Sequence, residues 1–332
     1  MATTEMVSFG LRRRMRARSQ VPPIPEMVFP GSEGRPFPLL ADLVLGYGRG
    51  APAPRVLYLG DSSVFRVAHQ DVDQRPLGQM VQDAAGGPGA LVWSAGSAHQ
   101  PELWQHVVPL FEGRLEQRPK ILLLPVNLRA FSTQWTGNPL WALQAEQAAL
   151  QAWQPADMVG PIPRVVGDHK LFAGYDRRSA GVRDLGRLGE LRRLASSRPA
   201  ESAGQAAAQA RLGRLLRWHY GERLLPSHPR LRALAGLCAR AAALGIQVVA
   251  YATPLNVHAA QRICGDELIG RIRANLAVVQ GQLPASAAFV DLHALLPETA
   301  FFHVNLATEH MADAGRHTLA ARIVPLIDGG NQ

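Results

Sequence analysis

The feature that most constrains the fold is an alternation of short apolar runs with stretches of helical periodicity, extending from residue 55 to residue 327. The segment Lys120–Val126 is an almost unbroken apolar run, which is typical of a strand covered on both faces. The predicted strands are Arg55–Leu59, Ala90–Trp93, Lys120–Val126, Ile246–Ala252 and Ala287–Asp291. The predicted helices between and after them span 74–85, 101–114, 229–244, 259–280 and 312–327. This order predicts an α/β fold, a three-layer α/β/α sandwich with a mostly parallel five-stranded sheet.

The same pattern divides the chain into an arm and one domain. Residues 1–50 are rich in proline, glycine and arginine and show little periodicity, so we expect a partly irregular N-terminal arm. Residues 51–330 form the predicted α/β domain. A helical insertion at about 128–228 interrupts it after the third strand. Such an insertion would either cap a site at the carboxyl end of the sheet or have no contact with a substrate.

The charge of the chain does not indicate a nucleic-acid partner. The formal net charge is +9, but the only lysines are Lys120 and Lys170, and the remaining positive charge is arginine in a chain rich in alanine, glycine and proline. The basic stretches are not interleaved with the aromatic side chains that stack on single-stranded bases. We therefore expect no nucleic acid as partner.

Other compositional features bear on the compartment. No run approaches the roughly 18 apolar residues that a membrane helix needs, so we expect no membrane partner. Arg12–Arg14 is followed by the proline-rich segment Val21–Pro25 and not by an apolar signal core, which favours a cytoplasmic location. Cys238 and Cys264 have no metal-ligand spacing and are predicted to be buried free thiols.

A candidate nucleophile follows the first predicted strand. The apolar run Val56–Leu59 ends at Gly60-Asp61-Ser62-Ser63, where a helix is expected to begin. The carboxyl end of a parallel strand is the usual place for chemistry in an open α/β sheet. Asp61, Ser62 and Ser63 are also good N-cap residues, so capping without catalysis is the alternative.

A second signal precedes the last predicted helix. His310 opens the segment His310–Gly315, and its imidazole is a candidate general base for Ser62. The histidine could instead cap or pack that helix. His303, His310 and His317, together with Glu309 and Asp313, also suggest a metal cluster, but no metal-binding spacing is present and no metal or cofactor is expected.

With Gly60-Asp61-Ser62 after a strand and His310 near the end, the chain resembles the SGNH/GDSL hydrolase superfamily, whose fold is flavodoxin-like. The resemblance implies that Ser62 is the nucleophile. It also implies that the oxyanion hole consists of the Ser62 N–H, the N–H of Gly96 after the second strand, and the side chain of Asn127 after the third. Gly96 lies somewhat earlier than the family pattern has it, and Asn127 lacks the glycine and aspartate that flank its family counterpart.

The last block of the family pattern matches in part. His310, Met311 and Gly315 have the family spacing, but Ala307 occupies the position of the aspartate that orients the histidine. Glu309 is the candidate acid that we assign in its place. Asp291, Asp313 and a Ser–His dyad held by a backbone carbonyl are the alternatives.

The resemblance implies an enzyme that forms an acyl-Ser62 intermediate with His310 as general base. It would act on a small-molecule or carbohydrate ester, as an ester hydrolase or as an O-acyltransferase, which differ in the nucleophile that reaches the acyl-enzyme. The alternative from another class is a catalytically silent SGNH-like protein that binds a carbohydrate, an acidic ligand or a protein partner. The alanine at position 307 favours this alternative.

Overall fold

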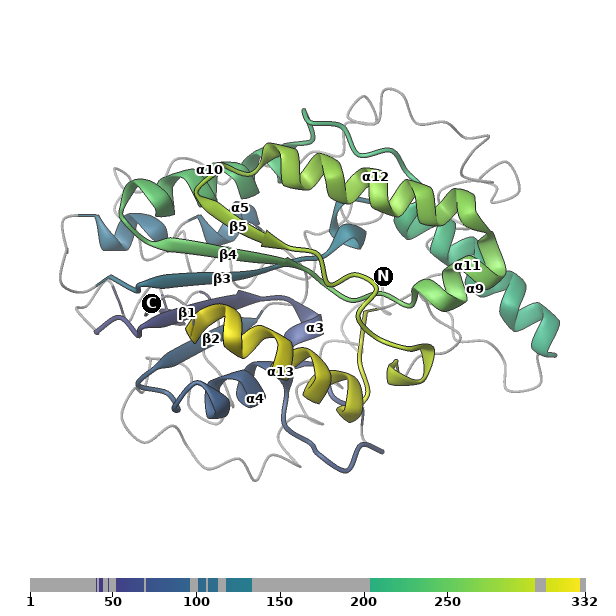
Figure 1. Cartoon of the computed structure of the whole chain (residues 1–332), viewed down its shortest axis with the longest axis horizontal. Coiled ribbons are helices and arrows are strands. Elements are labelled where there is room, and N and C mark those ends of the chain that lie inside the picture. Colours follow the sequence, from purple (N-terminus) through teal and green to yellow (C-terminus); the bar gives the residue numbers. More distant parts are fainter. Residues whose placement is uncertain are drawn as a thin grey trace, which may run out of the picture.

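The computed structural model describes residues 40, 42–43, 47, 52–68, 70–95, 101–105, 107–112, 118–132, 204–301 and 309–328 of the 332-residue chain. At its centre is a five-stranded parallel sheet with the strand order β2-β1-β3-β4-β5 (Figure 1). The strands are β1 (Val56–Gly60), β2 (Leu91–Ala95), β3 (Ile121–Val126), β4 (Gln247–Ala252) and β5 (Ala287–Val290). The predicted α/β fold with a parallel sheet of five strands is confirmed.

Both faces of the sheet are covered by hydrophobic side chains. In β1, Leu57 and Leu59 belong to one buried cluster, whereas Val56 and Tyr58 belong to another. Because successive side chains of a strand point to opposite faces, this division places one cluster on each side. The first cluster includes residues of α9 (Gln205–Tyr220), α10 (Pro229–Ala243), α11 (Val257–Cys264) and α12 (Asp266–Gln282), and the second includes residues of α4 (Leu77–Ala84) and α13 (Asp313–Asp328) (Figure 1).

Two of the predicted helices were wrong in extent. The segment predicted as a helix over 101–114 contains the short helix α5 (Pro101–Trp104) and the 3₁₀ helix η1 (Val108–Phe111). Pro109 lacks an N–H and disfavours helical geometry at the residue before it, which prevents one continuous helix. The helix predicted over 259–280 is divided into α11 and α12 at Gly265, whose φ of 78° is a conformation that other residues rarely adopt.

Parts of the predicted arm and insertion contribute to the core. Leu40, Leu43 and Tyr47 are buried in the first cluster, where the ring centroid of Tyr47 lies 5.3 Å from that of Phe111. The rest of the predicted arm lies outside the described residues. Of the predicted insertion, the structure describes residues 128–132 and 204–228, which include the 3₁₀ helix η3 (Leu128–Phe131) and α9. Helix α9 packs against α11, α12 and η3.

The structure bears on membrane-spanning helices and on the two thiols. Within the described ranges, none of the helices has both the length and the apolar character needed to cross a bilayer. Both cysteines are free; Cys238 is buried, whereas Cys264 is half-buried. Burial raises the pKa of the Cys238 thiol to about 12, so this side chain packs as a small apolar group.

His228 caps the N-terminus of α10 from a buried position. Its Nδ1 accepts a hydrogen bond from the backbone N–H of Arg230 over 3.2 Å, and its ring meets that of Phe131 edge-on at 5.4 Å. Burial, followed by the charges of Arg230 and Arg232, lowers the pKa of His228 from 6.5 to about 3. The cap therefore requires the neutral imidazole.

This cap predicts a pH-dependent loss of stability. Because the folded-state pKa of His228 is depressed, the unfolded chain binds a proton first as the pH falls below 6.5. The contribution of His228 to the free energy of unfolding then falls by up to about 1.4 kcal/mol for each pH unit. His228→Asn retains a capping acceptor that does not titrate, and urea unfolding of both proteins across this range should show a shallower slope for the variant. Equal slopes would contradict the assignment.

Candidate active site

The candidate site lies where the strand order of the sheet reverses. Strand β1 pairs with β2 on one side and with β3 on the other, so the chain leaves β1 in one direction and returns on its opposite side. Open α/β sheets bind their ligands at this reversal, beyond the carboxyl ends of the strands. Ser62 follows β1 and Asn127 follows β3, so both predicted site residues emerge at this position.

A tight turn presents Ser62 at the start of the short helix α3 (Ser62–Phe65). A Cβ at Gly60 would lie 2.5 Å from Cγ2 of Val64, so only glycine allows this helix to fold back so closely. Asp61 is the N-cap, and its Oδ1 accepts hydrogen bonds from the Ser63 N–H at 2.8 Å and the Ser63 Oγ at 2.6 Å. Capping accounts for Asp61 and for Ser63, but not for the side chain of Ser62.

The structure brings Ser62 and His310 together. The His310 Nε2 lies 3.2 Å from the Ser62 Oγ, although the two residues are 248 positions apart in the sequence. Ser62 retains 6% of its surface exposed, and His310 is half-buried. This distance lies at the long end of hydrogen-bond reach for a serine and its general base in a site without substrate.

His310 is held in place through the residues that follow it. Met311 forms an isolated antiparallel bridge with Phe301, and the Ala312 N–H donates to the Ala300 carbonyl over 2.8 Å. Helix α13 begins immediately afterwards, with Gly315 buried in its first turn. The histidine therefore precedes a rigid element that packs on the sheet.

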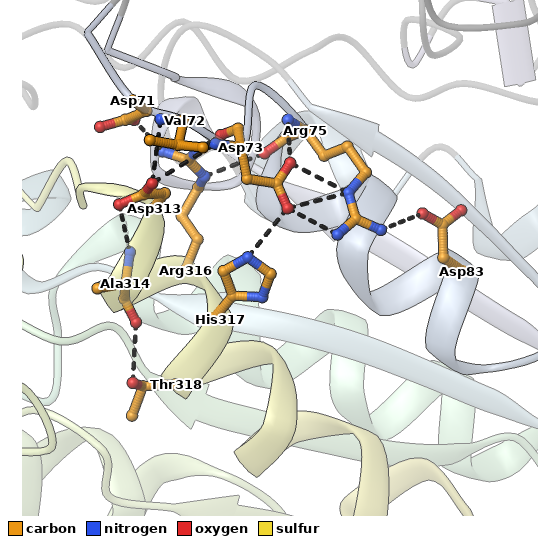
Figure 2. A network of polar contacts seen from close by, with 10 residues as sticks. All are labelled: Asp71, Val72, Asp73, Arg75, Asp83, Asp313, Ala314, Arg316, His317 and Thr318. Atoms are coloured by element: carbon orange, nitrogen blue, oxygen red, sulfur yellow. Dashed lines mark hydrogen bonds and ion pairs between the residues drawn. The ribbon is translucent and has the colours of Figure 1, made fainter.

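A buried polar network ties α13 to the segment that follows α3 (Figure 2). Arg316, which is fully buried, donates from Nη1 to Asp71 Oδ2 at 2.6 Å and to the Met311 carbonyl at 3.1 Å. It also donates to the carbonyls of Arg75, at 3.0 Å from Nε, and of Asp73. One guanidinium thus joins the chain downstream of Ser62 to the residue next to His310.

Asn127 has a defined orientation in the site. Its Nδ2 donates to Asp61 Oδ2 over 3.0 Å, and its Oδ1 accepts from the Arg129 N–H over 3.1 Å. One of the two amide hydrogens is therefore committed to Asp61, and the other has no acceptor among the residues that the structure describes. Gly96, the remaining predicted oxyanion donor, lies outside the described residues, as does Ala307.

Glu309, the predicted acid, is buried and has other partners. The Tyr220 hydroxyl donates to Glu309 Oε1, and the Arg129 Nε lies 3.3 Å from Glu309 Oε2. Burial raises the pKa of Glu309, while Arg129 and Tyr220 act in the opposite direction. Oε1 accepts a hydrogen bond, whereas Oε2 makes an ion pair with Arg129 and has no hydrogen-bond donor in the part of the chain that the structure describes; these two partners do not favour Glu309 as the partner of the imidazole.

The alternative acids also bind other groups. Asp291 Oδ1 lies 2.5 Å from His293 Nδ1 and accepts from the His293 N–H over 3.1 Å. Asp313 Oδ2 accepts from the backbone N–H groups of Val72, at 3.1 Å, and Asp73, at 3.5 Å. Of the residues suggested as a metal cluster, His317 pairs with Asp73 at 2.9 Å, His310 faces Ser62, and His303 is not among the described residues. Within the described ranges, no three His, Cys, Asp or Glu side chains are grouped so that they could hold a metal ion.

Two residues of the site were missed in the sequence. Arg129 and Tyr220 form a buried cluster with Glu309, next to His310. Arg129 lies two positions after Asn127, but in an arginine-rich chain this placement carries little signal. Tyr220 ends α9, 89 positions away from Glu309, and no pattern in the sequence connects them.

The cluster predicts a loss of stability in the Tyr220→Phe protein. Removal of the hydroxyl leaves a buried carboxylate oxygen of Glu309 without its donor, which costs about 1–3 kcal/mol. Urea unfolding of Tyr220→Phe, Glu309→Met, which has no oxygen to accept from the hydroxyl, and the double variant should give a coupling energy of about 0.5–3 kcal/mol. Additive effects would show that the hydroxyl and the carboxylate do not interact.

No protein-family model matches this sequence, and no curated protein matches it.

Proposed function

We propose that the protein is a serine-dependent enzyme that cleaves oxygen esters through an acyl-Ser62 intermediate, as an ester hydrolase or an O-acyltransferase. One observation carries the proposal: the 3.2 Å separation of the Ser62 Oγ and the His310 Nε2 at the carboxyl end of a parallel sheet. A serine is a weak nucleophile unless a neighbouring base removes its proton. The imidazole of His310 is within reach to do so.

The chemistry takes place in two halves. The Ser62 Oγ attacks the acyl carbonyl carbon while its proton passes to His310 Nε2, which gives a tetrahedral oxyanion. This intermediate collapses as the carbon–oxygen bond of the ester breaks, and His310 returns the proton to the departing alcohol. Water or an acceptor alcohol then gives its proton to His310 and attacks the acyl-Ser62 carbonyl. The second tetrahedral intermediate collapses as the bond from the acyl carbon to Ser62 Oγ breaks, and His310 returns its proton to Oγ, which releases the new acid or ester and restores the Ser62 hydroxyl.

The oxyanion would be stabilised by donors that converge near Ser62. The proposed donors are the Ser62 N–H, the second amide hydrogen of Asn127 and the N–H of Gly96. The hydrogen bond from Asn127 to Asp61 supports this role, because it fixes the amide before substrate binds. One such preorganised donor contributes about 2.7–4 kcal/mol to lowering the barrier.

The three-layer α/β/α arrangement and the SGNH-like ancestry are parts of the same proposal. Hydrophobic clusters on both faces of the sheet support the layered arrangement. In this proposal the helical insertion caps the site. The contact of Tyr220, at the end of α9, with the residue before His310 supports this role.

A catalytically silent SGNH-like protein is the second candidate. Ala307 occupies the family position of the orienting aspartate, and the carboxylate of Glu309 is engaged by Arg129 and Tyr220. Such a protein would bind a carbohydrate, an acidic ligand or a protein partner at the same end of the sheet. It would carry no activated serine.

Labelling with a fluorophosphonate distinguishes the two candidates. We expect the wild-type protein to be labelled and Ser62→Ala to remain unlabelled. Ser63→Ala is the matched control, because this neighbouring hydroxyl donates to Asp61 and plays no part in the proposed attack, so labelling should persist. Absence of labelling in the folded wild-type protein across several fluorophosphonates would favour the silent binding protein.

A further inference from the structure

Arg66 lies directly after the helix that begins with Ser62. Its backbone N–H donates to the Ser62 carbonyl over 3.0 Å, so its position is fixed relative to the proposed nucleophile. The side chain is half-buried, with its Cζ 5.5 Å from the ring centroid of Phe65. Its Nε is shielded from solvent and makes no hydrogen bond to any part of the chain that the structure describes.

Two other arginines, Arg316 and Arg129, have their charges balanced by carboxylates, whereas Arg66 does not. Arg316 pairs with Asp71 at 2.6 Å, and Arg129 pairs with Glu309 at 3.3 Å. In the described ranges, no carboxylate forms an ion pair with Arg66. Instead, burial and the positive charge of Arg129 both lower the pKa of Arg66. A shielded donor and a nearby like charge are both unfavourable without an anion to compensate them.

We propose that Arg66 binds an anionic group carried by the substrate, so that the enzyme acts on esters with a carboxylate or phosphate close to the scissile bond. A guanidinium is suited to both groups because its planar fork can donate two parallel hydrogen bonds. The statement that the anion is part of an ester substrate rests on the function proposed above. Binding of an anion at Arg66 does not depend on turnover.

Solvation alone explains Arg66 less well. An arginine on a solvated face keeps its donors in water, whereas the Nε of Arg66 is shielded. Contact with the Phe65 ring accounts for the position of the guanidinium but leaves that donor unused. An anion on the guanidinium would supply the counter-charge that no described carboxylate gives Arg66.

Binding to the Ser62→Ala protein tests the anion site separately from catalysis. The first probe pair is N-(p-nitrophenyl)succinamic acid and its methyl ester, which carry or lack a charge on the acyl side. The second pair is p-acetamidobenzoic acid and its methyl ester, which carry or lack it on the side of the leaving group. Calorimetry in the Ser62→Ala background, with and without Arg66→Gln, gives the charged-to-neutral affinity ratio for each pair.

We expect at least one pair to show about tenfold tighter binding of the charged member, and Arg66→Gln to abolish the preference. Arg66→Lys should retain part of it. Arg240→Gln, which removes an exposed charge near the end of α10, should leave it unchanged. The inference is overturned if neither pair shows a preference, or if the preference survives Arg66→Gln in a folded protein. An Arg66-dependent preference in a protein whose Ser62 is not labelled would support the anion site and reject only the hydrolase function.

Discussion

His310→Ala and Ser62→Ala are each expected to lower kcat for ester cleavage by about 10³- to 10⁶-fold, because each removes one half of the unit that activates the nucleophile. The double variant should be no slower than the slower single variant, since groups that act as a unit are not additive. Steady-state rates with a chromogenic short-chain ester measure all of these effects.

Two controls make the result specific. Ser63→Ala should retain kcat within a few-fold, although it loses a hydrogen bond to Asp61. Circular dichroism should show that each variant is folded. If Ser62→Ala retained wild-type turnover, or if its effect and that of His310→Ala were additive, the two residues would not form a catalytic pair.

Arg316→Met is expected to give the largest loss of stability, about 3–5 kcal/mol, because it removes one partner of a fully buried ion pair. The carboxylate of Asp71 would be left buried without the guanidinium. The carbonyls of Asp73 and Arg75 would each lose a donor as well (Figure 2), as would the carbonyl of Met311. Urea unfolding of the wild-type and variant proteins measures the difference in their free energies of unfolding.

Arg75→Met is the matched control within the same network. Arg75 pairs with Asp73 at 2.6 Å and with Asp83 at 2.9 Å, but its side chain is 44% exposed (Figure 2). Solvent screens such pairs, so the loss should stay below about 1 kcal/mol. The Arg75 carbonyl that accepts from Arg316 is unaffected by this substitution. Equal losses in the two variants would show that burial does not determine the strength of this network.

The sheet could be predicted because its strands carry a local signal. β3 is buried along its whole length and appears in the sequence as an unbroken apolar run. β1 ends at Gly60, where the apolar run also stops. Strand order could not be predicted, since it depends on pairings between residues such as Ile121 and Gln247 that are far apart in the chain.

The extents of the helices were less predictable because single residues override periodicity. Leu103, Val107 and Leu110 have helical spacing, yet Pro109 interrupts the helix they suggest. Gly265 likewise adopts a positive φ within an otherwise periodic stretch. Both residues can be read in the sequence, but a prediction from the spacing of apolar residues alone does not take them into account.

The site residues that could be predicted lie directly after a predicted strand or directly before a predicted helix. Ser62 and Asn127 were placed by the strands before them, and His310 by the helix after it. Arg316 and Tyr220 act through contacts with distant backbone and carboxylate groups, which the sequence does not encode locally. The acid that would orient His310 could not be predicted either. Glu309 is adjacent to His310 in the sequence, but its carboxylate contacts Arg129 and Tyr220, which are distant in the chain.

Mass spectrometry of the acyl-enzyme tests the central claim most directly. The wild-type protein is mixed with a p-nitrophenyl ester, quenched with acid during the first turnover and digested, and the acylated peptide is sequenced. We expect the mass of one acyl group on Ser62, and none at that position in the His310→Ala protein at the same time. Release of p-nitrophenol with the acyl group on another residue, or on none, would contradict the account.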